Sequence, residues 1–203
     1  MALIVTVNGS PSAGSRTQAL AAQVGAAVAA RGFEVADINV RDLPPEDLIY
    51  GRTDSAPLRR ALDLIERAAG VVITTPVYKA SYTGVLKAFL DLLPQFGLNG
   101  KVALPLVTGG TAAHVLVIDY ALRPVLHALG AQHVVGGLFI IDKLLERRPS
   151  GELVVSAEIG DRLWAVVDDF VGSLRRRASG TLGQDAPVSV EGAAPPRSAA
   201  ASL

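Results

Sequence analysis

The chain has 203 residues, of which half are hydrophobic and 19% are charged, a composition that suits one globular domain with a substantial core. The formal net charge is zero, so charge gives no reason to expect a nucleic-acid partner or a strongly basic protein partner. There is no cysteine, which excludes disulfides and thiolate chemistry, so any redox function must use a bound cofactor.

Apolar segments typical of strands alternate along the chain with segments typical of helices. Helix signals are clear at 56–69, because Asp54 or Ser55 can cap this segment and Pro57 lies in its first turn. In chain order the sequence predicts strand 3–7, helix 16–30, strand 33–40, helix 56–69, strand 71–75, helix 84–93, strand 102–107, helix 111–129, strand 133–140 and helix 160–177.

Five strand–helix repeats predict the α/β class. Short, continuous apolar strands suit a parallel sheet, and right-handed crossovers then give a five-stranded doubly wound sheet with helices on both faces. The dinucleotide-binding and flavodoxin-like strand orders both fit this pattern. In either order, ligands bind at the carboxyl ends of the strands.

The predicted domain spans residues 1–177. Residues 178–203 contain no aromatic side chain, and we expect them to form a disordered C-terminal tail. The charged stretch 142–156 is expected to be a surface loop or a hairpin. The apolar start of the chain is too short for a signal-peptide core and Asp119 interrupts the apolar stretch 115–122, so we expect a cytoplasmic protein.

Loop one, residues 9–17 (GSPSAGSRT), follows the first predicted strand and is predicted to bind a phosphate. The helix that starts near Ser15 offers free N–H groups and the positive end of its dipole. The loop adds hydroxyl donors and one charge from Ser10, Ser15, Thr17 and Arg16. No acidic residue precedes Glu34, so nothing nearby in the sequence repels an anion. An ordinary capped turn is the alternative.

Loop one matches known nucleotide loops only in part. Gly9 and Gly14 have the spacing of GxxxxGK[ST], but Ser15 and Arg16 stand where that loop has Lys followed by Ser or Thr, so the contact to a triphosphate is missing. The GxGxxG motif of dinucleotide sites and the GxSxG motif of hydrolases are absent. A terminal monophosphate best suits a loop of hydroxyl and N–H groups.

Two further loops are expected on the same edge of the sheet. Loop two, residues 74–84 (TTPVYKASYTG), presents two tyrosines as a stacking platform for a flat ring, although they would also suit a subunit interface. Loop three, residues 108–111 (TGGT), has two glycines whose backbone N–H groups can face a ligand. A phosphate loop, an aromatic loop and a backbone-donor loop together describe a site for flavin mononucleotide (FMN).

These segments resemble the NADPH-dependent FMN reductases of the flavodoxin-like superfamily, and among them the reductase partner of bacterial two-component alkanesulfonate monooxygenases. The matching features are GSP and SRT in loop one, PEDLIYGRTDS at 45–55, TPVYKASYTGVLKAFLDLLP at 75–94 and LPLVTGGTAAHVLVIDYALRPVLHALGA at 104–131. They cover roughly residues 3 to 140. The resemblance implies a flavodoxin-like fold, FMN and NADPH as cofactors with NADH as an alternative, and a homo-oligomer that is a dimer or a tetramer.

The resemblance also implies which residues contact the cofactor. Phosphate contacts fall on Ser10, Ser15, Arg16 and Thr17, and ring contacts fall on Pro76, Val77, Tyr78, Gly109, Gly110 and Thr111. Lys79 and Thr108 complete the expected cofactor-binding set, and Arg16, Lys79 and Arg123 are candidates to contact a 2′-phosphate. The family often has Arg where Ser12 stands, so phosphate binding in this chain is expected to rest more on Arg16.

The predicted helix 111–129 contains an interior proline. The ring of Pro124 would clash with the carbonyl oxygen of Tyr120, at a cost of about 3 kcal/mol in an unadapted helix. A local widening of the turn near Tyr120 would relieve the clash, and a simple kink is the alternative. In the resembling family a tyrosine at this position lies in such an insertion at a tetramer interface, which implies a role for Tyr120 in flavin exchange. The helix is apolar nearly all round, which favours pairing between subunits.

The sequence therefore predicts NAD(P)H-dependent reduction of FMN, with the reduced flavin passed to a partner monooxygenase, as in sulfonate sulfur assimilation. The cofactors supply the hydride chemistry, so no catalytic side chain is predicted. The alternatives are a flavodoxin-like electron carrier, against which the neutral charge argues, and a quinone, azo or chromate reductase with bound FMN. No metal site is predicted, because His114, His127 and His133 have no metal-ligand neighbour at a suitable spacing.

Overall fold

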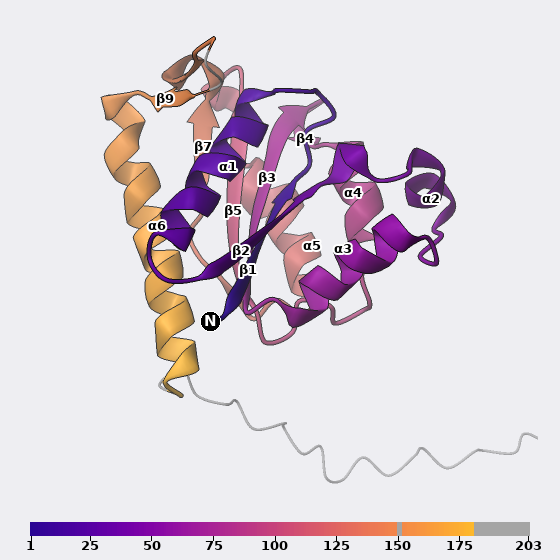
Figure 1. Ribbon diagram of the computed structural model, residues 1–203. Helices are drawn as coiled ribbons and strands as arrows, with labels where there is room; N and C mark the ends of the chain where they lie inside the picture. The colour runs from indigo at the N-terminus through magenta and orange to yellow at the C-terminus, as the bar shows by residue number, and fades with distance from the viewer. Residues whose placement is uncertain (150–151, 181–203) are drawn as a thin grey trace, which may run out of the picture.

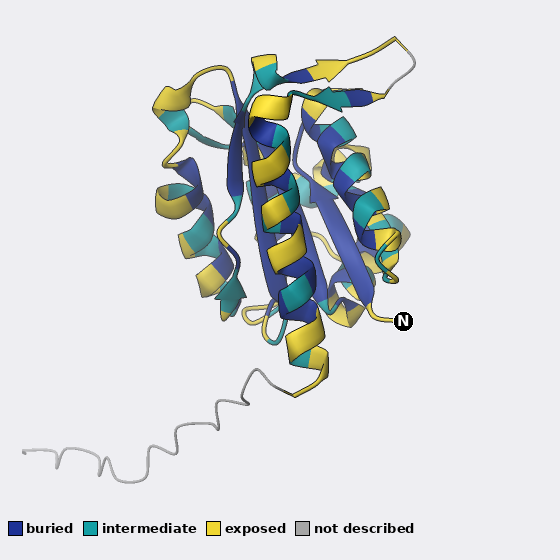
Figure 2. Ribbon diagram, turned by 90° about the vertical axis from the view of Figure 1, so that its left-hand side faces the viewer, coloured by how far each residue is buried: buried dark blue, intermediate teal, exposed yellow. Residues whose placement is uncertain are grey.

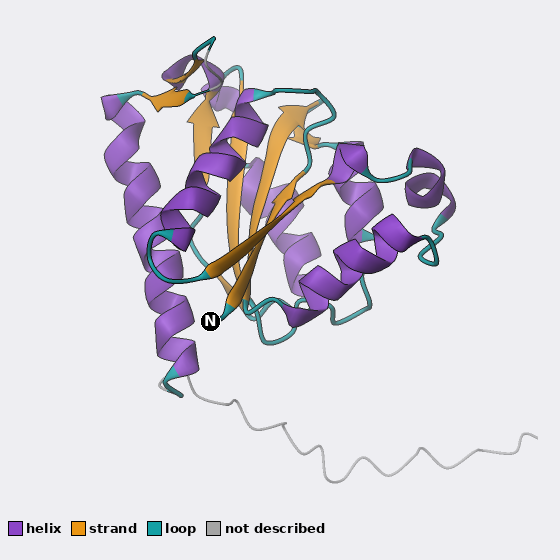
Figure 3. Ribbon diagram, in the orientation of Figure 1, coloured by secondary structure: helices purple, strands orange, loops and turns teal. Residues whose placement is uncertain are grey.

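A computed structural model of the protein describes residues 1–149 and 152–180. Its central sheet lies between two layers of helices (Figure 3). The parallel strands run in the order β2 (Glu34–Asn39), β1 (Leu3–Asn8), β3 (Gly70–Tyr78), β5 (Val102–Gly109) and β6 (His133–Val134), and β7 (Leu138–Ile141) also pairs with β5. With β6 and β7 taken as one interrupted strand, this is the flavodoxin-like order, which confirms the predicted doubly wound fold.

The two helical layers cover opposite faces of the sheet (Figure 1). One layer consists of α1 (Arg16–Ala29) and α6 (Ala157–Ala178). The other consists of α3 (Ala56–Arg67), α4 (Gly84–Leu90) and α5 (Arg123–Ala128). Each layer has its own apolar cluster against the sheet. In Figure 2, α6 turns its exposed residues to the viewer while the strands behind it are buried.

The sequence signals for helix starts correspond to caps in the structure. The Ser15 hydroxyl oxygen accepts a hydrogen bond from the Gln18 N–H at 3.1 Å and caps α1. Ser55, one of the two expected candidates, caps α3 in the same way, and Pro57 lies in the first turn of that helix.

Several short elements were not predicted. They include α2 (Pro45–Tyr50) and β4 (Ser81–Tyr82), which pairs antiparallel with β3. The stretch 142–156, expected to be a surface loop or a hairpin, contains the hairpin of β8 (Leu145–Arg147) and β9 (Leu153–Val155). Helix ends also differ from expectation, most of all in α4 and α6. Helix α4 ends at Leu90, before Pro94, and α6 begins three residues earlier than predicted because Ser156 caps it.

The prediction of one continuous strand at 133–140 is wrong. Strands β6 and β7 are separated by residues 135–137, opposite Pro105 of β5. Pro105 has no N–H to donate to a neighbouring strand. Gly137 has a φ of +75°, and a Cβ at this position would lie 2.7 Å from the Pro105 carbonyl oxygen. The chain therefore leaves the ladder around Pro105 and rejoins it at Leu138.

The prediction of one continuous helix at 111–129 is also wrong, but the expected widening of the turn at Tyr120 is confirmed. The segment consists of a 3-10 turn at Ala112–His114, a π-helix at Ile118–Leu122 and then α5. Pro124 is the second residue of α5, where its missing N–H costs no helical hydrogen bond. The wider π turn lies directly before the proline, where it relieves the expected clash with the proline ring.

Helix α6 ends at Ala178, and Ser179 and Gly180 form a turn after it. The remainder of the predicted tail, residues 181–203, lies outside the described residues. Within the described part of the chain, no helix combines the length and the apolar character that crossing a membrane requires.

Candidate functional site

Loop one connects the carboxyl end of β1 to α1. The Asn8 Oδ1 accepts a hydrogen bond from the Ser10 N–H at 3.2 Å, and the Ser10 Oγ accepts one from the Ser12 N–H at 3.3 Å, so the loop is folded back on itself. Ser10 and Thr17 are buried, whereas Arg16 is exposed. Within residues 1–149 and 152–180, the Arg16 guanidinium makes no hydrogen bond or ion pair.

The first turn of α1 leaves donors for a ligand. The N–H groups of Arg16 and Thr17 have no acceptor within the helix, because no turn precedes them. The oxygen of Ser15 is used for capping, and its hydroxyl proton remains able to donate. The first turn contains no acidic residue that would oppose an anion.

Buried hydroxyl groups hold the three loops together. The hydroxyl oxygens of Thr17 and Thr108 are 2.8 Å apart and share a hydrogen bond between loops one and three. The Thr83 hydroxyl donates to the Gly9 carbonyl oxygen at 2.5 Å, which joins loop two to loop one. The Thr83 N–H in turn donates to the Thr75 hydroxyl oxygen at 3.2 Å. The expectation that the three loops lie together at one edge of the sheet is thus confirmed.

Loop two is a tight hairpin between β3 and β4. Its turn residues, Lys79 and Ala80, have φ values of +50° and +62°, the left-handed region that favours glycine, so the turn is strained. The hairpin exposes Lys79 and half of Tyr78 at its tip, while Tyr82 is partly buried against the core. Burial raises the pKa of the Tyr82 phenol, and the neighbouring Lys87 opposes this rise, so Tyr82 stays neutral at physiological pH.

Loop three begins within the last two residues of β5, and Thr108 at its start lies directly beside Pro76 in the sheet register. A Cβ at Gly109 would lie 2.8 Å from Cζ of Phe139, so Gly109 lets the backbone pass close to that ring. Gly110 and Thr111 are exposed, and no atom lies within 4 Å of the position of a Gly110 Cβ. The backbone of these two residues is thus open to solvent.

Tyr120 lies on the π-helix and is 79% exposed. It lines a hollow of about 430 Å³ that also includes Ala80 at the tip of loop two. The side chains of Val115 and Leu116, just before the π-helix, are more than half exposed. The segment 115–122 was expected to be buried on more than one side. Within a single chain, one side of it is buried and the side with Val115, Leu116 and Tyr120 is exposed.

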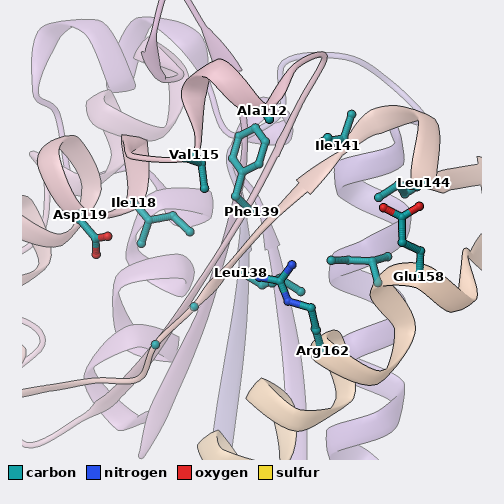
Figure 4. A pocket seen from close by; sticks show the side chains of 13 residues that line it. Ala112, Val115, Ile118, Asp119, Leu138, Phe139, Ile141, Leu144, Glu158 and Arg162 are labelled. Atoms are coloured by element: carbon teal, nitrogen blue, oxygen red, sulfur yellow. The ribbon is translucent and has the colours of Figure 1, made fainter.

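A second cavity of about 380 Å³ lies beyond loop three (Figure 4). Ala112 and Val115 line it from the segment after loop three, Phe139 from β7, and Glu158 and Arg162 from α6. None of the predicted cofactor-binding residues lines this cavity. It is therefore a neighbour of the candidate site and not part of it.

The predicted FMN-contacting residues lie at the carboxyl edge of the sheet and Tyr120 lies on the π-helix beside it, but some residues of this edge were missed. Arg123, a candidate for the 2′-phosphate, begins α5, where its guanidinium pairs with Asp119 and donates to the Val134 carbonyl oxygen. Asn8 and Thr83 shape loop one by the hydrogen bonds described above. Asn8 was readable as a polar residue at a strand end, and Thr83 as a helix cap before Gly84. Arg147 of β8 lies against Gly14, and nothing in its local sequence indicates this contact.

The histidines make contacts that fit structural roles. The His127 Nδ1 is 2.8 Å from the Ala131 carbonyl oxygen, and the His133 Nε2 is 2.9 Å from the Ser173 hydroxyl oxygen. Across residues 1–149 and 152–180, no three His, Cys, Asp or Glu side chains are grouped so that they could hold a metal ion.

Comparison with known proteins agrees with this fold. The family model for NADPH-dependent FMN reductases matches residues 2–146. The FMN reductase (NADPH) of Pseudomonas putida is 42% identical over 178 residues, which are 86% of this chain and 89% of that protein. An NADH:FMN oxidoreductase (EMOB), solved in its apo form, is 45% identical with a TM-score of 0.79, over 85% of this chain and 90% of that one. A flavodoxin from Archaea is 12% identical with a TM-score of 0.56, over 85% of this chain and 99% of that one, and shares the fold. By the match of the family model and of the 42% identical relative, this chain belongs to the NADPH-dependent FMN reductase family.

Proposed function

We propose that this protein reduces FMN with NADPH. The observation that carries the proposal is the meeting of loops one, two and three at one sheet edge, tied together by the Thr17–Thr108 and Thr83–Gly9 hydrogen bonds. The name of the 42% identical relative, FMN reductase (NADPH), supports NADPH as the reductant. The name of the 45% identical solved structure makes NADH the second reductant to test.

Loop one fits the phosphate of FMN. It supplies the N–H groups of the first turn of α1, the hydroxyls of Ser10, Ser15 and Thr17, and the unpaired guanidinium of Arg16. A phosphate monoester carries close to two negative charges at neutral pH, which these donors would stabilise together with the helix dipole. We assign the phosphate contacts to these four side chains.

Loops two and three fit the flavin ring. Pro76, Val77 and the exposed face of Tyr78 would pack against its apolar part, with Lys79 at the rim. Thr108 would fix loop three to loop one, and the open backbone from Gly109 to Thr111 would direct N–H groups to the polar edge of the ring. When bound, FMN and NADPH supply the hydride transfer themselves. The protein contributes binding, orientation and N–H donors, so no catalytic acid or base is assigned.

Arg16 supplies the charged side chain of loop one. The wild-type protein is expected to oxidise NADPH in the presence of FMN, and Arg16→Gln should raise the KM for FMN about tenfold by removing a charged hydrogen-bond donor. The KM for riboflavin, which lacks the phosphate, should not change. The measurement is the fall in absorbance at 340 nm with FMN, riboflavin or no flavin, with NADPH and with NADH.

Arg67→Gln is the matched control, because Arg67 is an exposed arginine at the far end of α3. Its KM for FMN should equal the wild-type value. Absence of any flavin-dependent NADPH oxidation by the wild-type protein would contradict the proposed function. Faster reduction of a quinone than of free FMN would favour a reductase that keeps FMN bound.

We further propose that the protein acts as a homo-oligomer, dimer or tetramer, that passes reduced FMN to a flavin-dependent monooxygenase, with Tyr120 involved in flavin exchange. The exposed Val115, Leu116 and Tyr120 support an interface between copies at the π-helix, because exposed apolar side chains gathered on one segment mark interaction surfaces. The hollow that joins Tyr120 to loop two supports a link between this interface and the flavin.

Tyr120→Ala is expected to shift the protein toward smaller assemblies and to change the KM for FMN, because Tyr120 presents a large exposed ring at the proposed interface. Sedimentation velocity and steady-state kinetics measure the two effects. Phe96→Ala removes a similarly exposed ring between α4 and the start of β5, and should change neither. Unchanged mass and unchanged KM in Tyr120→Ala would refute this role.

A further inference from the structure

The hairpin of β8 and β9 brings a second arginine to loop one. The hairpin packs along α1 (Figure 1), and the Gln23 side-chain amide of α1 donates to the Leu153 carbonyl oxygen at 3.4 Å. Arg147 pairs with Leu153 in the hairpin register, so the contact with α1 also places Arg147. The matched family segment ends at residue 146, one residue before this arginine.

The Arg147 guanidinium lies against Gly14. Its Nη1, Cζ and Nη2 atoms are 3.0, 3.4 and 3.5 Å from the position that a Gly14 Cβ would occupy. The terminal nitrogen Nη1 is the nearest of these atoms, so the donor end of the guanidinium reaches loop one at Gly14. Gly14 has a φ of +59°, so this glycine provides both the left-handed turn and the room for the guanidinium.

Arg147 has no carboxylate partner within residues 1–149 and 152–180. Its neighbour Arg148 differs, because the Arg148 Nη1 is 3.0 Å from the Glu152 Oε2 in the same hairpin. A cavity of about 360 Å³ lies between Arg147 and the start of α1, and Ser15 and Gln18 line it. The Arg147 guanidinium, without a carboxylate partner, therefore lies beside the Ser15 hydroxyl and an open space. Loop one itself supplies one further arginine, Arg16.

We infer that Arg147 is a second phosphate-binding cation of loop one, supplied by the hairpin and acting beside Arg16. This inference rests on the proposed function, since it adds a residue to the same site. The ligand chemistry is a phosphate monoester, which the guanidinium binds through paired N–H donors. Two sources carry such a group, namely the 5′-phosphate of FMN and the 2′-phosphate of NADPH.

The test compares Arg147→Gln with the wild-type protein. FMN and riboflavin binding are measured by the change in flavin fluorescence, which needs no turnover, and the KM values are measured for NADPH and NADH. We expect Arg147→Gln to weaken FMN binding about fivefold to tenfold and to leave riboflavin binding unchanged. Arg147→Lys, which keeps the charge but not the planar donors, should fall between the two. Arg148→Gln in the same hairpin should bind FMN as the wild type does.

Each outcome decides the inference. A rise confined to the KM for NADPH, with FMN binding and the KM for NADH unchanged, supports Arg147 as a phosphate-binding cation and assigns it to the 2′-phosphate. Equal weakening of FMN and riboflavin binding, or no change with any ligand, overturns the inference. Failure of the proposed function is a separate result, because it would appear as absent NADPH oxidation in the wild-type protein whatever Arg147 binds.

Discussion

Gly9→Ala is expected to lower the free energy of unfolding by about 2 kcal/mol and to weaken FMN binding strongly. The new Cβ would lie 2.6 Å from the Cβ of Leu86, and neither atom can move by a side-chain rotation. The Gly9 N–H donates to the Thr74 carbonyl oxygen at 2.8 Å and the Gly9 carbonyl accepts from Thr83, so a shift of loop one breaks contacts on both sides. Urea denaturation and FMN fluorescence measure the two effects.

Gly160→Ala is the control for this substitution. Gly160 lies within α6, and a Cβ there would meet no atom within 4 Å. Alanine has the higher helix propensity, so the control is expected to be neutral or to stabilise the protein by up to about 1 kcal/mol. A Gly9→Ala protein as stable as the wild type would show that loop one does not pack on α4 as described.

Thr17→Val is expected to destabilise the protein by about 1–3 kcal/mol, because it leaves the Thr108 hydroxyl buried without its partner. The double variant Thr17→Val with Thr108→Val removes both hydroxyls and should cost less than the sum of the two single changes. The measurement is a double-mutant cycle of unfolding free energies in urea. It reports the contact between loops one and three directly.

Thr111→Val serves as the control within loop three, because Thr111 is exposed and a change at an exposed position costs less than about 0.5 kcal/mol. Additive effects of Thr17→Val and Thr108→Val would be incompatible with a shared hydrogen bond. The double-mutant cycle thus tests the contact between loops one and three without any bound cofactor.

Much of the fold and of the site location follows from local patterns in the sequence. The apolar strands are buried under helices on both faces of the sheet. A continuous apolar run in the sequence predicts this burial. Ser55 was one of two predicted caps because capping depends on a few adjacent residues. The widened turn at Tyr120 was predictable from Pro124, since the steric conflict acts within one helical turn.

Features that depend on neighbours distant in sequence were not predictable. The interruption between β6 and β7 depends on Pro105 in the adjacent strand, which is not visible from the segment 133–140 itself. The turn at Lys79 and Ala80 contains no glycine, so its left-handed conformation carries no sequence signal. Arg147 reaches Gly14 because the hairpin packs along α1, a tertiary contact that joins residues far apart in the chain.

The interruption between β6 and β7 also inserts one residue into the strand. Val134 pairs with Ala103, but Leu138 pairs with Leu106, so four residues on one strand match three on the other. The insertion reverses the alternation of side chains, and Leu138 points toward α6 while Phe139 points toward the opposite layer. The ring of Phe139 thereby reaches Gly109. The one-residue insertion in the edge strand therefore determines which side chain packs against the backbone of loop three.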